Sequence, residues 1–280
     1  MTRPHLALSL PELLVAILEH LSADGLMVAA LVCKVWSAPA VNIIWRTQTI
    51  TLSRLLAKLA PINRKDYNLY EITPITQDDW NLFLEQYANR VTKLDLDVVF
   101  NTNSLMLIST LLKTFSGLLC SNLTSLTGYG TENYWTLFDL LTLTKLQEVG
   151  FMVKLPSFAE DTLWSQLAHR ATQIRDIIAP RQLESFDFSI FSQLRSLSTS
   201  DYHNLAYCLH LRVLDLRDTR ARVTAIQQSS GEAVTFPRLE EFFIFSGNDV
   251  ADDMTLRSVM PALRVLQYRR ITWDRTTYPS

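Results

Sequence analysis

The sequence predicts an α/β protein in which a small N-terminal helical module is followed by a parallel sheet of short strands. Short apolar patterns with helical periodicity occupy the first part of the chain. A second pattern, Leu-x-x-Leu-x-Leu, returns from about Arg90 onward and is typical of a strand followed by a return segment. The predicted organisation is a three-helix module at 1–48, a linking helical region at 49–89 and a repeat domain at 90–280.

Composition indicates a folded chain with no general affinity for polyanions. Apolar residues make up 48% of the 280 residues, which excludes disorder and supports a sizeable core. The 26 basic and 28 acidic residues nearly balance, so neither nucleic acid nor a membrane surface is an expected partner. Only 7 glycines are present, which argues against a glycine-rich nucleotide-binding fold.

The cysteines indicate a reducing compartment. Cys33, Cys120 and Cys208 are widely spaced and form no Cys-x-x-Cys pair, so we expect reduced, buried thiols. The apolar N-terminal run is interrupted by Pro11 and Glu12 and is followed by no signal-peptide cleavage site. No window reaches the ~18 apolar residues of a membrane span. The expected location is therefore cytoplasmic and/or nuclear.

The first expected helix begins within Ser9–Glu12. This stretch offers a capping hydroxyl, a proline in the first turn and an acid near the positive end of the helix dipole. A wide apolar face follows, made of Leu13, Leu14, Ile17, Leu18 and Leu21.

Two further short helices are expected. Ser22 and Asp24 are N-cap candidates for the second, which would run to Trp36, and Pro39 marks the start of a third that ends near Trp45. Three helices of this length cannot bury such wide faces among themselves. Either they cover the core of the following domain, or part of the apolar face belongs to another protein.

The order of these residues resembles an F-box over about residues 8–47. The resemblance is carried by "LPELL" at 10–14, then Ile17, Leu21 and Leu26, then "LVCKVW" at 31–36 and "WR" at 45–46. In that family the module binds the Skp-type adaptor of a cullin–RING (SCF) ubiquitin ligase, so the resemblance implies that adaptor, and through it a cullin, as partners. The implied contact residues are Leu10, Pro11, Leu14, Ile17, Leu18, Val32, Cys33 and Trp36. Glu directly after Pro, followed by two leucines, is a variant seen mainly in fungal F-box proteins.

The repeat domain resembles degenerate leucine-rich repeats without a regular Asn ladder. Successive first positions lie between 17 residues (Leu194 to Leu211) and 32 residues (Val91 to Leu123) apart, which brackets the ~20–29-residue period of that class. The eight segments begin at Val91, Leu123, Leu146, Ile174, Leu194, Leu211, Leu239 and Leu263. The expected return segments include Phe138–Leu143, Thr162–Leu167 and Asp253–Met260, and Thr76–Leu96 is an expected helix-then-strand opening.

Strand alternation predicts which side chains face outward. The candidate target-binding face comprises Asp95, Asp97, Tyr129, Met152, Asp215, Arg217, Phe243, Phe245, Gln267 and Arg269. Two phenylalanines on an open sheet face indicate either a partner or coverage by the C-terminal segment. Arginines concentrated in the last quarter of the chain either hold an acidic or phosphorylated segment or form a solvated edge.

No catalytic arrangement is evident, so we expect no enzyme, cofactor or metal. The five histidines show no metal-ligand spacing. His203, Cys208 and His210 lie close in sequence, but no nucleophile motif surrounds them.

The expected function is substrate recognition in an SCF-type ubiquitin ligase, with the F-box on the adaptor and the repeats on an unidentified target protein. The alternative is an F-box protein that scaffolds or sequesters a partner without degrading it. The sequence leaves open the identity of the target, whether it must be phosphorylated, and whether its binding leads to degradation.

Overall fold

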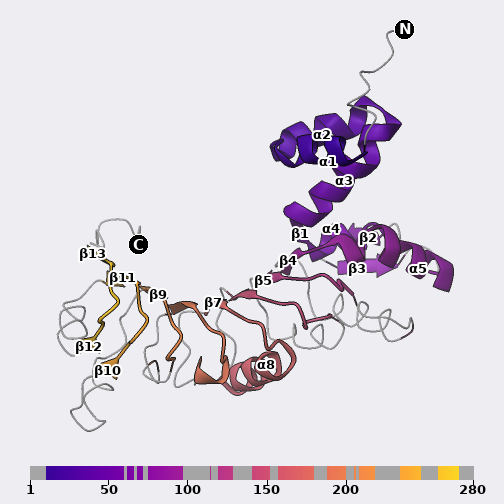
Figure 1. The fold of residues 1–280 in the computed structure, drawn as a ribbon. Helices are drawn as coiled ribbons and strands as arrows, with labels where there is room; N and C mark the ends of the chain where they lie inside the picture. Colours follow the sequence, from indigo (N-terminus) through magenta and orange to yellow (C-terminus); the bar gives the residue numbers. More distant parts are fainter. Residues whose placement is uncertain are drawn as a thin grey trace, which may run out of the picture. The chain divides into compact units, whose positions relative to one another are not determined.

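The computed structural model of the chain divides into two compact units, Met1–Ser125 with Thr136–Thr142, and Leu126–Trp135 with Leu143–Ser280 (Figure 1). The structure describes residues 11–59, 62–65, 68–71, 75–96, 114, 119–128, 141–151, 157–179, 188–199, 205, 208–217, 234–246 and 258–270.

The first unit opens with a module of three helices, α1 (Pro11–Glu19), α2 (Ala23–Val32) and α3 (Lys34–Thr47). The expected N-cap of the second helix is confirmed, because the Ser22 side chain accepts a hydrogen bond from the Gly25 amide. One residue, Cys33, separates α2 from α3. This short connection makes α2 and α3 neighbours in space as well as in sequence.

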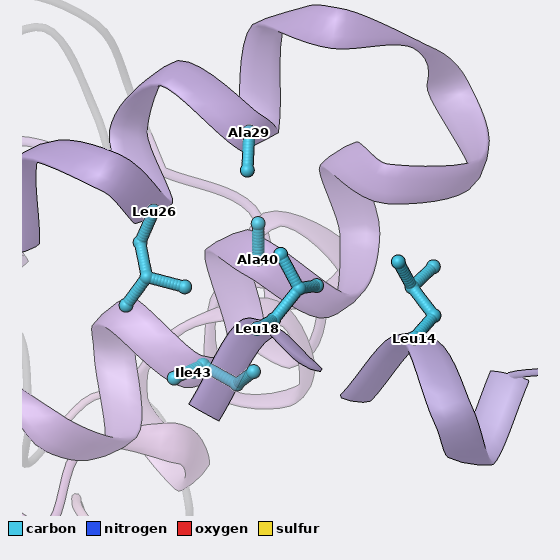
Figure 2. Packing of buried hydrophobic residues seen from close by; sticks show 6 residues of the cluster. All are labelled: Leu14, Leu18, Leu26, Ala29, Ala40 and Ile43. Atoms are coloured by element: carbon cyan, nitrogen blue, oxygen red, sulfur yellow. The ribbon is translucent and has the colours of Figure 1, made fainter. Parts of the chain in front are cut away.

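The module has a small core of its own, shown in Figure 2. One side of each helix contributes to it, and its buried members are Leu14, Leu18, Leu26, Ala29, Ala40 and Ile43. Trp36 and Ile44 pack against this cluster and are only partly buried. The alanines allow the helices to approach closely, and the leucines fill the space between them.

The prediction that Pro39 begins the third helix is wrong. Pro39 lies inside α3, which starts at Lys34, so Trp36 belongs to α3 and not to α2. Proline removes one helical hydrogen bond and normally disfavours an interior position. Burial of Ala40 and Ile43 immediately afterwards holds the helix together despite this loss.

The linking region contains strands as well as helices. Its elements are β1 (Thr49–Thr51), α4 (Leu52–Leu56), β2 (Ile62–Lys65), β3 (Asn68–Glu71), α5 (Gln77–Gln86) and the 3-10 turn η2 (Ala88–Arg90). Strands β2 and β3 form an antiparallel hairpin. Strand β1 pairs in parallel with β4 (Lys93–Leu96). The first parallel pair of strands therefore starts inside the region that was expected to be only helical.

The expected helix-then-strand opening is confirmed by α5 and β4. Thr76 caps α5 with a capping box, in which its hydroxyl accepts from the Asp79 amide and the Asp79 carboxylate accepts from the Thr76 amide. The Thr76 hydroxyl also donates to the Asp79 carboxylate at 2.6 Å, and this bond, together with the one from the Thr76 amide, lowers the pKa of Asp79. At the other end of the helix, the Tyr87 ring packs on Trp45 of α3 at a centroid distance of 5.3 Å.

Parallel strands dominate the second unit, after β5 (Ser125–Gly128) at the boundary between the units. The elements are β6 (Glu148–Phe151), α8 (Ser157–Arg170), β7 (Asp176–Ile178), η3 (Phe188–Ile190), β8 (Ser196–Thr199), β9 (Val213–Arg217), β10 (Val234–Thr235), β11 (Glu241–Ser246), β12 (Ser258–Val259) and β13 (Val265–Arg270). Neighbours follow in the order β6-β7-β8-β9-β11-β13, and β10 pairs separately with β12 (Figure 1).

The inward positions predicted from the sequence form one buried column in the second unit. Its in-register members are Val149, Ile177, Leu197, Leu214, Phe242 and Leu266. All are buried except Leu266, whose side chain is 52% exposed, so the expectation that it lies in the core is wrong. Leu266 lies on β13, which ends the run of paired strands among the described residues and therefore has a neighbour on one side only.

A turn precedes each of the strands β6, β7, β8, β9, β11 and β13. A hydrogen bond across this turn holds the first residue of the repeated pattern in place. In the turn before β9, for example, the Leu211 amide donates to the Cys208 carbonyl, and both side chains are buried. The same three-residue hydrogen bond joins Leu146 to Leu143 and Leu194 to Phe191. The recurring leucine therefore anchors the turn as well as the core.

Aromatic side chains fill the core of the second unit beside α8. Trp164 of this helix is fully buried and meets Phe151, Phe188 and Phe191 with ring centroids 5.8, 6.3 and 6.2 Å away. The expected return Thr162–Leu167 lies within α8 and is helical. The other two expected returns fall mostly outside the described residues.

Candidate functional site

The helical module has a second apolar surface besides its core. Large hydrophobic side chains from all three helices are exposed, and we call them the apolar face: Leu13, Ile17, Leu21, Met27, Val28, Leu31, Val32 and Val35. Several large apolar side chains exposed on one small module are typical of a surface that binds another protein. The most exposed member is Leu31, at 87%.

The sequence of α2 explains why this face is exposed. Its residues, ADGLMVAALV, are apolar on nearly every side, whereas only one side can pack against α1 and α3. Leu26 and Ala29 occupy that side, and Met27, Val28 and Leu31 point elsewhere. A helix that is apolar all round is ordinarily buried on all sides, so the sides of α2 that are exposed among the described residues are suited to a covering partner.

The structure divides the predicted contact residues into two groups. Pro11, Ile17, Val32 and Cys33 are exposed, as an interface would require, and Trp36 is half-buried. Leu14 and Leu18 are not at the surface, because they are 2% and 0% exposed and form the core with α2 and α3.

Leu10 lies outside the described residues. Leu13, Leu21, Met27, Val28, Leu31 and Val35 are exposed residues that the sequence reasoning did not include. Position along α1 distinguishes the two groups, since Leu14 and Leu18 lie one turn apart on the buried side, and Leu13 and Ile17 lie one turn apart on the neighbouring exposed flank.

Arg46 joins the module to the elements that follow it in the first unit. Its guanidinium forms an ion pair with Glu19 at the end of α1. Its carbonyl accepts a hydrogen bond from the Thr92 hydroxyl, just before β4. The ion pair is about half exposed, so it orients the helices more than it stabilises them.

The cysteines differ in accessibility, which corrects the expectation of three buried thiols. Cys120 and Cys208 are buried, but Cys33 is exposed at the junction of α2 and α3, beside the apolar face. Burial raises the pKa of the Cys120 thiol to about 12. Since the thiolate is the reactive form, Cys120 is doubly protected from modification.

We expect one fast-reacting thiol in the native chain. Maleimide labelling at neutral pH, followed by mass spectrometry, should modify Cys33 first and the other two cysteines only after denaturation. The variant Cys33→Ser is the control and should show no fast phase. Rapid labelling of that variant would mean that Cys120 or Cys208 is accessible.

A second candidate surface lies on the parallel strands. We call the outward positions of β6, β7, β8, β9, β11 and β13 the open face. Asp215 and Phe243 are half-buried there, opposite each other in register. The Ser198 hydroxyl donates to the Asp215 carboxylate at 3.3 Å. The backbone register places four further predicted residues at the alternate positions of β9, β11 and β13 that belong to this face: Arg217, Phe245, Gln267 and Arg269.

The remaining predicted residues of this surface lie elsewhere. Asp95 is half-buried on β4 in the first unit. Asp97, Tyr129 and Met152 lie outside the described residues.

Acidic and basic side chains meet on the open face. Glu148 of β6 and Asp176 of β7 are in register. Burial raises the pKa of Asp176, the neighbouring Glu148 carboxylate raises it further, and Arg175 and Arg195 act in the opposite direction. The sequence reasoning missed this group, because register between strands cannot be obtained from spacing along one chain.

Replacing Asp176 by Asn should change how stability depends on pH. A carboxyl whose pKa is raised by folding stabilises the folded chain below its unfolded pKa, and this contribution is lost as the pH rises through the folded pKa. Asn does not ionise, so the variant should gain stability relative to the wild type as the pH rises. Urea unfolding at pH values from acid to neutral measures this, and a pH-independent difference would contradict it.

No candidate metal-binding cluster is found in the described part of the chain. No group of three or more His, Cys, Asp or Glu side chains is placed to hold a metal ion there. No helix within the described ranges is long and apolar enough to cross a membrane. The described residues offer two candidate binding surfaces, the apolar face and the open face.

Comparison with known families identifies the helical module. Residues 9–51 match the F-box-like family, so the chain contains an F-box-like domain over α1, α2, α3 and β1. The match does not extend to the other parallel strands. A search of curated proteins found no match to the chain.

Proposed function

We propose that this chain is the substrate-recognition subunit of an SCF-type E3 ubiquitin ligase. The observation that carries the proposal is the apolar face of the F-box-like domain, which a partner would bury. F-box domains generally bind Skp-type adaptors, and through the adaptor the chain would reach a cullin. Leu14 and Leu18 would support this interface from the core, while Ile17, Leu31 and Val32 would contact the adaptor.

The parallel strands would hold the target protein. Their turns, inward column and irregular spacing are similar to degenerate leucine-rich repeats, and their open face carries charged and aromatic positions. A target held there would meet the ubiquitin-carrying enzyme at high effective concentration, so the chain would need no catalytic residue of its own. We infer from the two cysteines in buried turns that the chain works in a reducing compartment, the cytoplasm and/or the nucleus.

The test is affinity purification of the tagged chain from cells, with and without a proteasome inhibitor, followed by blotting for the adaptor, the cullin and ubiquitin. Recovery of adaptor and cullin, with ubiquitinated proteins accumulating under the inhibitor, is the expected result. Recovery of the adaptor without cullin or ubiquitinated proteins would favour a scaffold or sequestering protein instead. Recovery of neither would contradict the proposal.

A further inference from the structure

Three arginines occupy equivalent positions in adjacent repeats of the second unit. Arg175, Arg195 and Arg212 each directly follow the buried residue that closes the turn. The Arg195 amide donates to the Arg175 carbonyl and the Arg212 amide to the Arg195 carbonyl, both at 2.7 Å. Neighbouring members are therefore about one strand spacing apart, roughly 4.8 Å. We call these three residues the arginine row, which lies at the N-terminal ends of β7, β8 and β9.

The centre of the arginine row is available to a ligand. Arg195 and Arg212 are exposed and Arg175 is half-buried. Within the part of the chain that the structure describes, Arg195 interacts electrostatically with the half-buried Asp176 carboxyl, and its own side chain is exposed. The residues next along the chain, Ser196 on β8 and Val213 on β9, carry no charge.

Carboxylates mark both ends of the row. Asp176 lies near Arg175 and Arg195, and Glu240 pairs with Arg212 at 3.7 Å in a partly exposed contact. These acids would repel a long polyanion such as RNA that runs past the row. A short anionic motif avoids the acids at both ends and can still meet the guanidinium of Arg195 in the middle.

We propose that the arginine row binds a short acidic motif of the target protein, with Arg195 as its central contact. This rests on the proposed role of the parallel strands in target binding. The anionic oxygens belong either to Asp and Glu side chains or to phosphorylated Ser and Thr, since arginine forms bidentate hydrogen bonds with both groups.

The experiment measures fluorescence polarisation with labelled synthetic peptides that share one Gly-Ser framework. One peptide carries a run of glutamates, one carries phosphoserines and one carries glutamines, and single-stranded oligouridine is tested alongside. The full chain is compared with Arg195→Glu and with Arg238→Glu. Arg238 is the matched control, because it is an exposed arginine of the same unit that lies in the Phe236–Leu239 turn and outside the row.

The full chain should bind the glutamate or the phosphoserine peptide more tightly than the glutamine peptide. Arg195→Glu should weaken this binding by about tenfold, and Arg238→Glu should change it by less than about twofold. The peptide that binds more tightly identifies the source of the anionic groups. Arg195→Gln serves as a milder variant if charge reversal disturbs folding, which circular dichroism detects.

Three results would overturn the proposal: equal binding of the glutamine peptide, tighter binding of oligouridine than of either acidic peptide, or equal losses in Arg195→Glu and Arg238→Glu. Binding of the same proteins to a Skp-type adaptor is measured in parallel. If the adaptor binds and the acidic peptides do not, only the role of the arginine row fails. If the acidic peptides bind and the adaptor does not, the proposed ligase function fails and the row remains.

Discussion

Replacing Leu31 by Asp is expected to lower the affinity for a Skp-type adaptor by at least about a hundredfold. Leu31 is the most exposed member of the apolar face, so its side chain is free to enter an interface. A carboxylate in its place would have to be desolvated without a partner when the adaptor covers the face. The fold should be unaffected, because Leu31 is outside the core of the module. Isothermal titration calorimetry measures the affinity.

The matched control for this substitution is Leu82→Asp. Leu82 is also a leucine on a helix of the first unit and is 51% exposed, but it lies on α5 and not on the apolar face. The control should bind the adaptor as the wild type does. Equal affinity of Leu31→Asp and wild type, or an equal loss in both variants, would contradict the assignment of the interface.

Replacing Trp164 by Ala is expected to lower the free energy of unfolding of the second unit by ~3–5 kcal/mol. The indole is 0% exposed and packs against three phenylalanine rings, so its removal leaves a large cavity. Urea denaturation followed by circular dichroism measures the change. Binding of the adaptor should persist in conditions where the first unit remains folded.

Ile190→Ala is the control for this cavity. Ile190 lies on η3 beside the same aromatic cluster but is 44% exposed, so its truncation should cost less than ~1 kcal/mol. A Trp164→Ala variant as stable as the Ile190→Ala variant would show that α8 does not contribute to the core of the unit.

The repeated strands could be predicted because each carries its own signal. An inward side chain at every second position and a buried residue three positions earlier are visible in a single segment, and the register in the structure aligns them. Leu266 was placed incorrectly because burial of a strand depends on neighbours on both sides, which the segment itself does not encode. Strand β1 was missed because three residues show no periodicity, and its pairing with β4 is a contact between distant segments.

The sequence predicts that the helical module contains three helices, but it does not predict which side of each helix is buried. The five apolar residues of the first expected helix form one wide face in the sequence, and only packing against α2 and α3 selects Leu14 and Leu18 for the core. Pro39 is a strong local stop signal, yet tertiary packing outweighs it in α3. Exposed members such as Val28 and Leu31 were missed because an apolar residue in a helix is ordinarily read as core.

The most direct test of the proposed function is a calorimetric titration of the purified chain with a purified Skp-type adaptor. A one-to-one complex with a negative heat-capacity change is expected, because the apolar face would be removed from water on binding. Cys33 should also become slower to label in the complex, since it lies beside that face. No binding by the folded chain, with Cys33 labelling unchanged by the adaptor, would contradict the account.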